Sequence, residues 1–242
     1  MTKLHALIIS SFLAAFSTVF SVTVEARDAH QPGTVVELYT SQGCSSCPPA
    51  DALMGKLVQN PDVLGLSFSV TYWDYIGWPD TFGDIKNDER QTRYREKLDT
   101  RYVYTPQMII AGQDHFVGSN QHELEENLIR FKDHAGRVKL KWRFTDTHLE
   151  VDLPQVDQGA VIWQMDLDRE NEVQIRRGEN RGKSVSYHNV VRKIQMLERW
   201  DGSKQILKLD LGMLAAAGRD GCAVILQKDG FGPIIAALVI NL

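Results

Sequence analysis

Cysteine and excess positive charge are both scarce in this chain of 242 residues. It contains three cysteines, one CxxC pair and no HxxxH pair, so a structural zinc site built from two such pairs is not expected. The formal net charge is −4, which gives no reason to expect nucleic acid or an anionic membrane surface as a partner. Internal repeats and low-complexity segments are also missing, and the composition is that of an ordinary globular protein.

Long hydrophobic runs are confined to the N-terminus. Residues 6–24 carry no charge and follow Lys3, and Val24 and Ala26 are small residues at the positions that a signal peptidase reads. We interpret residues 1–26 as a cleaved signal peptide; the alternative is an uncleaved membrane anchor, which the many Ser and Thr residues disfavour. The mature chain is therefore expected to be periplasmic or secreted, without membrane contact, where disulfides persist.

The rest of the chain changes its pattern near residue 137, which predicts two domains, 27–136 and 137–242. The first region predicts the order β-α-β-α-β-β-α, with strands at 34–40, 64–71, 107–111 and 115–117 and helices at 44–59, 84–98 and 120–131. The second region is β-rich and sandwich-like, with strands at 138–144, 147–153, 160–167, 190–197, 205–211, 222–227 and 234–240.

The CxxC pair, Cys44 and Cys47, lies between a predicted strand and a predicted helix. A helix N-terminus stabilises a thiolate, so Cys44 is expected to attack and Cys47 to resolve the mixed disulfide. A fixed structural disulfide is one alternative, although closing so short a loop contributes about 2 kcal/mol by the chain-entropy formula. Metal binding by the two thiols is the other alternative.

Three segments resemble the thioredoxin superfamily, and one of them, residues 115–124, is similar to its β-hairpin and last helix. Residues 39–47, Tyr-Thr-Ser-Gln-Gly-Cys-Ser-Ser-Cys, are similar to the strand and CxxC of its glutaredoxin-like members, and residues 105–110, Thr-Pro-Gln-Met-Ile-Ile, are similar to its cis-proline loop. The whole chain resembles an uncharacterised family of bacterial secreted thioredoxin-like proteins, which carries no settled activity. The resemblance implies a thioredoxin-like first domain, a cis bond before Pro106, and pairing of substrate backbone beside Thr105.

Four further residues are candidates for the same site. Glu37 is a candidate proton shuttle for the inner thiol, with an exposed strand-end carboxylate as the alternative. Trp73, Tyr75 and Trp78 belong to an aromatic loop expected at the same sheet edge as the CxxC, where they form a substrate-binding lip or seal an interface.

Two features fall outside this site. Cys222 lies in an apolar predicted strand and is interpreted as a small core residue, with a relay to the CxxC as the alternative. The basic run from Arg176 to Lys183 is interpreted as a solvated loop, with a partner site as the alternative.

The sequence thus predicts an exported thiol–disulfide oxidoreductase that acts on protein or peptide thiols and exchanges electrons with a redox partner. No cofactor and no metal are expected. One alternative is a redox-inert binding module that keeps the thioredoxin fold. Another is a periplasmic copper-handling protein that uses both thiolates.

Overall fold

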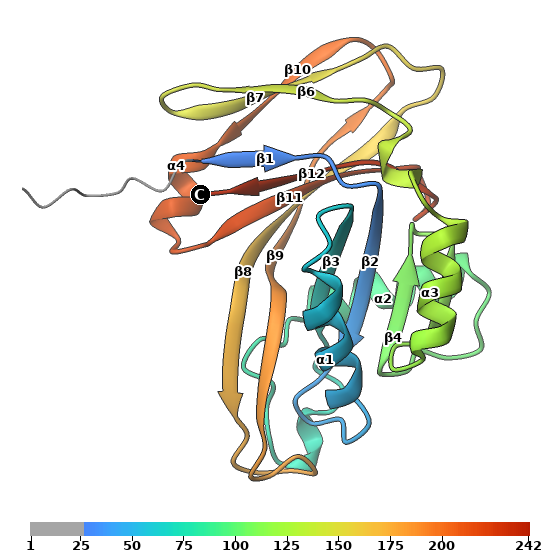
Figure 1. Cartoon of the computed structure of the whole chain (residues 1–242), viewed down its shortest axis with the longest axis vertical. Helices are drawn as coiled ribbons and strands as arrows, with labels where there is room; N and C mark the ends of the chain where they lie inside the picture. Colours follow the sequence, from blue (N-terminus) through green and yellow to red (C-terminus); the bar gives the residue numbers. More distant parts are fainter. Residues whose placement is uncertain (1–26) are drawn as a thin grey trace, which may run out of the picture.

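The computed structural model describes residues 27–242, and the predicted signal peptide lies outside the described residues. A nine-stranded sheet with the order β1-β12-β11-β8-β9-β3-β2-β4-β5 runs through the molecule (Figure 1). A second sheet has three strands in the order β10-β7-β6. The protein is therefore a mixed α/β structure dominated by strands.

One half of the large sheet contains β2 (Thr34–Thr40), β3 (Val63–Ser69), β4 (Gln107–Ile110) and β5 (Asp114–Val117). β2 and β3 are parallel, whereas β4 and β5 are antiparallel to their neighbours. The helices of this half are α1 (Pro48–Leu57), α2 (Ile85–Lys97) and α3 (Gln121–Arg130), with one-turn helices η1 (Asp74–Ile76) and η2 (His134–Gly136). The order β-α-β-α-β-β-α is the predicted one, and Asp84 and Asn120 cap α2 and α3.

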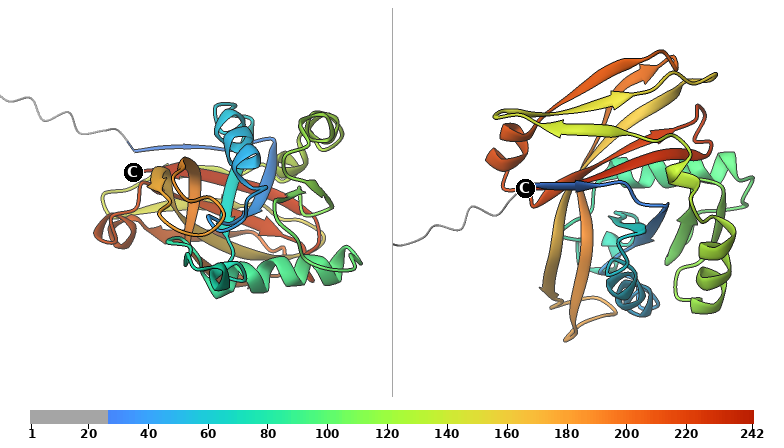
Figure 2. Two further views of the ribbon diagram at one scale, coloured as in Figure 1. Left: turned by 90° about the horizontal axis from the view of Figure 1, so that it is seen from below. Right: turned by 45° about the horizontal axis from the view of Figure 1, so that its top comes forward.

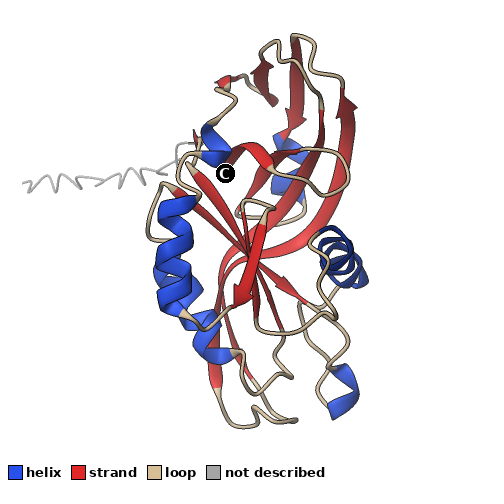
Figure 3. Cartoon of the chain, turned by 90° about the vertical axis from the view of Figure 1, so that its right-hand side faces the viewer, coloured by secondary structure: helices blue, strands red, loops and turns tan. Residues whose placement is uncertain are grey.

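The strand period of two assigns the side chains of β2 to opposite faces of the sheet. Val36 and Leu38 pack in one core cluster with residues of α1 and α3, whereas Val35 and Tyr39 pack in another with Tyr94 of α2. Figure 3 shows helices on both sides of the sheet. Alternation along β2 therefore decides which side chains can face the CxxC and α1.

The other half of the large sheet contains β1 (Asp28–His30), β8 (Ala160–Gln174), β9 (Ser184–Trp200), β11 (Gly221–Gln227) and β12 (Ile234–Asn241). β8 and β9 are much longer than predicted, because they continue as a paired arm in which single apolar residues such as Val173, Val185 and Tyr187 alternate with polar ones. The short strand β1 and the helix α4 (Leu211–Ala216) were not predicted.

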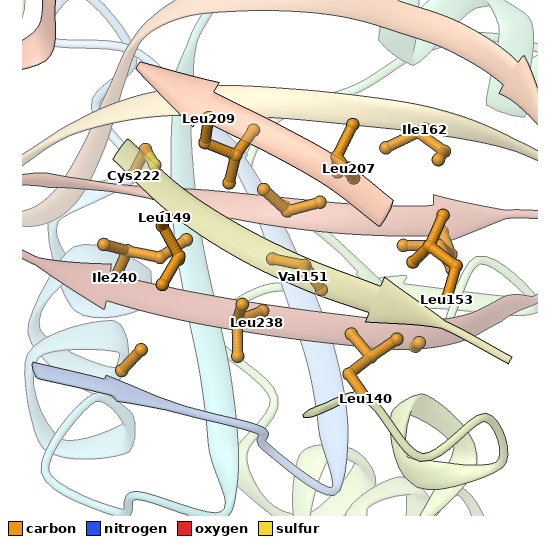
Figure 4. Close-up of a cluster of buried hydrophobic side chains, with 14 of the residues drawn as sticks. Leu140, Leu149, Val151, Leu153, Ile162, Leu207, Leu209, Cys222, Leu238 and Ile240 are labelled. Atoms are coloured by element: carbon orange, nitrogen blue, oxygen red, sulfur yellow. The ribbon is translucent and has the colours of Figure 1, made fainter. Parts of the chain in front are cut away.

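The second sheet contains β6 (Lys141–Phe144), β7 (His148–Leu153) and β10 (Gln205–Asp210). It packs on β8, β11 and β12, and Leu, Ile and Val side chains from both sheets fill the space between them (Figure 4). Figure 2 shows this small sheet lying across one end of the large one. The β-rich C-terminal region thus forms two facing layers.

Residue 137 marks no break in the large sheet, since strands from both sides of it belong to that sheet. β3 joins β9 through the backbone pair Ser67–Val190. Two side chains add to this junction: Ser67 Oγ donates to the His188 carbonyl at 2.8 Å, and Asn189 Nδ2 donates to the Gly65 carbonyl at 2.9 Å. Among residues 27–242, no helix has the length and apolar character needed to cross a bilayer.

Candidate redox site

The Cys44–Cys47 pair is a disulfide in the turn that leads into α1. The two Cα atoms are 5.4 Å apart, and the Cys47 N–H donates to the Cys44 carbonyl at 3.2 Å. The helix predicted from Cys44 begins at Pro48 instead, with Cys47 as its N-cap, because Pro48 and Pro49 fit a first turn in which no N–H is needed. Cys44 is 1% exposed and Cys47 is fully buried, whereas Ser45 and Ser46 between them are exposed.

The predicted aromatic loop holds this turn in place. Trp73 Nε1 donates to Thr105 Oγ1 at 2.7 Å, and the Trp73 side chain lies so close to Gly43 that an added Cβ would be 3.1 Å away. Trp78 Nε1 donates to Gln42 Oε1 at 2.8 Å, just before the CxxC. Trp73 and Trp78 are therefore partly buried braces. Tyr75 is 79% exposed and stacks on Trp73, so it is the aromatic side chain of the three that is free to meet a partner.

The Thr105–Pro106 peptide bond is cis, as predicted. Pro106 lies beside the first turn of α1, because a Cβ added to Gly118 would be 3.2 Å from Pro106 Cβ and 3.3 Å from Ala50 Cβ. Trp73 connects Thr105 to the CxxC turn from the other side. The structure thus brings Thr105, Pro106 and Trp73 together with the two cysteines.

Glu37 lies elsewhere than predicted. It is fully buried on the α2 face of β2, the face opposite α1. Its oxygens accept from Arg90 at 2.7 and 2.9 Å, from Tyr94 at 2.7 Å and from Tyr39 at 3.1 Å. A proton shuttle for Cys47 would have to project from the other face, so the structure gives this carboxylate a structural ion pair instead.

Asp51, which the sequence interpretation missed, is the buried carboxyl group on the α1 face. It lies one helical turn after Cys47, and its N–H donates to the Cys47 carbonyl at 3.1 Å. Oδ1 accepts from Thr40 Oγ1 at 2.7 Å, while Oδ2 has no hydrogen-bond partner among the described residues. Burial raises the pKa of Asp51 to about 8, against the lowering effect of the Thr40 hydrogen bond. The one available signal was its spacing of four residues from Cys47.

A second buried carboxyl group supports the turn. Asp80 Oδ2 accepts from the backbone N–H of Gln42 at 2.8 Å, and Asp80 Oδ1 accepts from the Phe82 N–H at 2.9 Å. Burial raises the pKa of Asp80 to about 6, and these backbone hydrogen bonds oppose the rise. Asp80 and Asp51 therefore both add buried acidic groups behind the cysteines.

The tip of the β8–β9 arm also contacts the turn, which the sequence interpretation did not foresee. Asn180 is 1% exposed, and its Nδ2 donates to the carbonyl groups of Gln42 at 3.0 Å and of Cys44 at 2.8 Å. Glu179 Oε2 accepts from the Ser45 N–H at 3.3 Å. Figure 1 shows this tip beside the loop that follows β3. Gly178 and Gly182 adopt positive φ, which allows the tight turn at the tip. These two glycines were the local sequence signal for an ordered turn.

Cys222 is a core residue, as interpreted from the sequence. It is fully buried in β11, among apolar side chains such as Leu149 and Ile240 (Figure 4). Burial raises the pKa of its thiol far above the usual range. Within residues 27–242, no group of three His, Cys, Asp or Glu side chains is placed to hold a metal ion.

Comparison with known proteins places the chain in a family. A family model described as "Protein of unknown function (DUF1223)" matches residues 35–227. The chain is similar to the crystal structure of protein AGR_C_4864 from Agrobacterium tumefaciens, with 35% sequence identity, a TM-score of 0.76, and coverage of 88% of this chain and 95% of that one. HBP35 of Porphyromonas gingivalis is similar in fold, at 11% identity and a TM-score of 0.55 over 86% of this chain and 74% of that one. The search of curated proteins found no match.

Proposed function

The chain belongs to the DUF1223 family of proteins of unknown function, and we propose that it carries out thiol–disulfide exchange through Cys44 and Cys47. The observation that carries the proposal is the disulfide at the start of α1, which lies one helical turn before the buried carboxyl group of Asp51. A ring this short adds about 2 kcal/mol to stability by the chain-entropy formula, so mechanical stapling is a weak reason for it.

We take residues 34–131 as a thioredoxin-like unit. The strand order β3-β2-β4-β5, with β2 and β3 parallel, supports this proposal. So do the placement of α1 opposite α2 and the position of Pro106, which lies close to Gly118 together with Ala50 of the first turn of α1. The disulfide then occupies the edge where β2 passes into α1, where loops present reactive groups.

The proposed reaction conserves atoms and electrons. A substrate thiolate attacks Sγ of Cys44, the Cys44–Cys47 bond breaks, and Cys47 leaves as a thiolate. A second substrate thiolate attacks the substrate sulfur of the mixed disulfide and releases Cys44. Two substrate thiols become one disulfide, and their two electrons and two protons pass to the cysteines. The reverse sequence reduces a substrate disulfide, and a redox partner restores the starting form.

Asp51 supplies the proton to Cys47 in this proposal. With a pKa of about 8, the carboxyl group is mostly protonated at neutral pH, and it lies on the same face of the helix as Cys47. A protonated acid beside a departing thiolate lowers the barrier to S–S cleavage. In the reverse direction the same carboxylate accepts the proton.

We further propose that the protein works outside the cytoplasm, as residues 1–26 predict. The disulfide supports this location, because such bonds persist in oxidising compartments. Its substrates would then be protein or peptide thiols of that compartment.

Replacing the resolving cysteine tests the function. Cys47→Ser should accumulate mixed disulfides between Cys44 and its substrates, because the bond can no longer be resolved from within. Adducts are detected by non-reducing electrophoresis and identified by mass spectrometry, with Cys44→Ser as the matched control. If Cys47→Ser forms no more adducts than Cys44→Ser, the protein is a redox-inert binding module. A reduction potential below roughly −300 mV would point to the same conclusion.

A further inference from the structure

The β8–β9 tip, residues 175–183, is attached to the redox turn at two points. Asn180 binds the carbonyl groups before and at Cys44, and Glu179 accepts from Ser45. Lys183 Nζ donates to Asn180 Oδ1 at 2.8 Å and completes the hydrogen bonding of that side chain. A segment whose Asn180 is 136 positions from Cys44 is thus part of the surface around Cys44.

The tip also carries a concentration of unpaired positive charge. Arg176, Arg177 and Arg181 are exposed, and none of their side chains bonds to another described residue. Farther along the same arm, Arg192 is paired with Asp168 at 3.2 Å. Arg192 is therefore neutralised within the arm, whereas the three tip arginines are not.

We propose that the β8–β9 tip is the substrate-recognition element of the redox site and selects thiols or disulfides carried on acidic peptide segments. This proposal rests on the proposed function. Three free guanidinium groups attract carboxylates and raise the encounter rate of an acidic partner by about 10-fold or more at low salt. Exposed Tyr75, stacked on the brace Trp73, offers an apolar contact in the aromatic loop that also holds the redox turn.

The test compares two peptides of equal length, with the cysteine flanked either by aspartates or by lysines. Each reduced peptide reacts with the oxidised protein, and its rate is divided by its rate with uncharged 2-hydroxyethyl disulfide, which removes differences in thiol pKa. The variant is Arg176→Glu/Arg177→Glu/Arg181→Glu. The control variant moves the same charge at exposed lysines elsewhere: Lys132→Glu/Lys141→Glu/Lys204→Glu.

Wild type and the control variant should prefer the acidic peptide about 10-fold at low salt, and the tip variant should lose or invert this preference. The preference should shrink in 0.5 M salt, where exposed charges are screened. Equal ratios in wild type and the tip variant would overturn the recognition proposal while leaving the redox proposal standing. If neither the peptides nor uncharged 2-mercaptoethanol open the Cys44–Cys47 bond in any variant, both proposals fail together.

Discussion

Two buried carboxyl groups lie on opposite sides of the same strand and have opposite surroundings. Glu37, on the α2 face, is fully buried and receives four hydrogen bonds, two of them from Arg90. Asp51, on the α1 face, is 2% exposed and receives one side-chain hydrogen bond, from Thr40. Both carboxyl groups are buried, but hydrogen bonds offset the lost hydration fully for Glu37 and only partly for Asp51.

The difference separates a structural group from a reactive one. Glu37 is held by Arg90, Tyr94 and Tyr39, and displacing it would break several hydrogen bonds at once. A buried carboxyl group with a free oxygen instead holds a proton at neutral pH and can exchange it. In the proposed reaction, that proton passes to Cys47, four residues before Asp51.

The largest expected effect is the loss of stability when the buried Glu37–Arg90 pair is broken. Glu37→Gln leaves the Arg90 guanidinium buried without a counter-charge, which should lower the free energy of unfolding by about 3–5 kcal/mol. Urea unfolding measures the loss. Glu96→Gln, which removes an exposed pair with Arg93 on the same helix, should cost under about 1 kcal/mol.

Restoring neutrality sharpens this test. The double variant Glu37→Gln/Arg90→Met should recover much of the lost stability, because no unpaired charge remains buried. Equal unfolding free energies for Glu37→Gln and Glu96→Gln would show that the buried pair contributes no more than a surface pair.

A smaller effect is expected at Asp51, and it depends on pH. Its folded pKa of about 8 exceeds the unfolded value of roughly 3.9, so the folded state keeps a proton that the unfolded state has released. Stability is therefore greatest below about pH 4 and falls as pH rises toward 8. The free energy of unfolding falls by at most about 1.4 kcal/mol per pH unit. Between pH 6 and 8, where Asp51 is partly deprotonated, the total loss is about 2 kcal/mol.

Asp51→Asn should remove this slope while keeping the acceptor for Thr40. The window from pH 6 to 8 lies above the pKa of Asp80, about 6, so Asp51 dominates there. Urea unfolding at several pH values measures the slope, and Asp157→Asn, at an exposed carboxylate, should keep the wild-type slope. If the unfolding free energies of wild type and Asp51→Asn depended equally on pH between 6 and 8, Asp51 would not be protonated in the folded state.

The sequence pattern predicted those strands and helices whose bounds are set by neighbouring residues. The strand Thr34–Thr40 has the predicted bounds, and α2 starts where Asp84 caps it, because apolar runs and caps are written in adjacent residues. The start of α1 was placed one turn early, since a CxxC before two prolines fits a turn as well as a helix. Glu37 lies on the strand that leads into the CxxC, so its position along the chain indicated the redox site, whereas the strand period of two puts its side chain on the opposite face.

The partners of the site could not be predicted, because they come from distant parts of the sequence. The outer parts of β8 and β9 carry only a short apolar alternation, Val173/Ile175 and Val185/Tyr187, yet they pair with each other and carry Asn180 to the Cys44 carbonyl. The basic run around Asn180 was interpreted as a solvated loop, and its arginines are indeed exposed. The sequence pattern gave no sign that this loop would contact the turn around Cys44.

The smallest expected effect concerns that contact. Asn180→Ala leaves two buried carbonyl groups without their donor, one of them on Cys44, and should lower stability by about 1 kcal/mol. Loosening the tip should also expose Cys44, so that in the Cys47→Ser background neutral iodoacetamide alkylates it about fivefold faster, which corresponds to about 1 kcal/mol.

Asn127→Ala is the matched control for this last variant. Asn127 is a buried asparagine in α3 whose amide donates to a backbone carbonyl, that of Glu123, away from the cysteines. It should cost similar stability but leave the alkylation rate of Cys44 unchanged. Because unfolding exposes Cys44 in either variant, rates must be compared at a pH and temperature where both stay folded. Equal alkylation rates for Asn180→Ala and Asn127→Ala under those conditions would mean that the tip does not control access to Cys44. The reactivity of Cys44 would then depend on Asp51 and on the braces Trp73 and Trp78 alone.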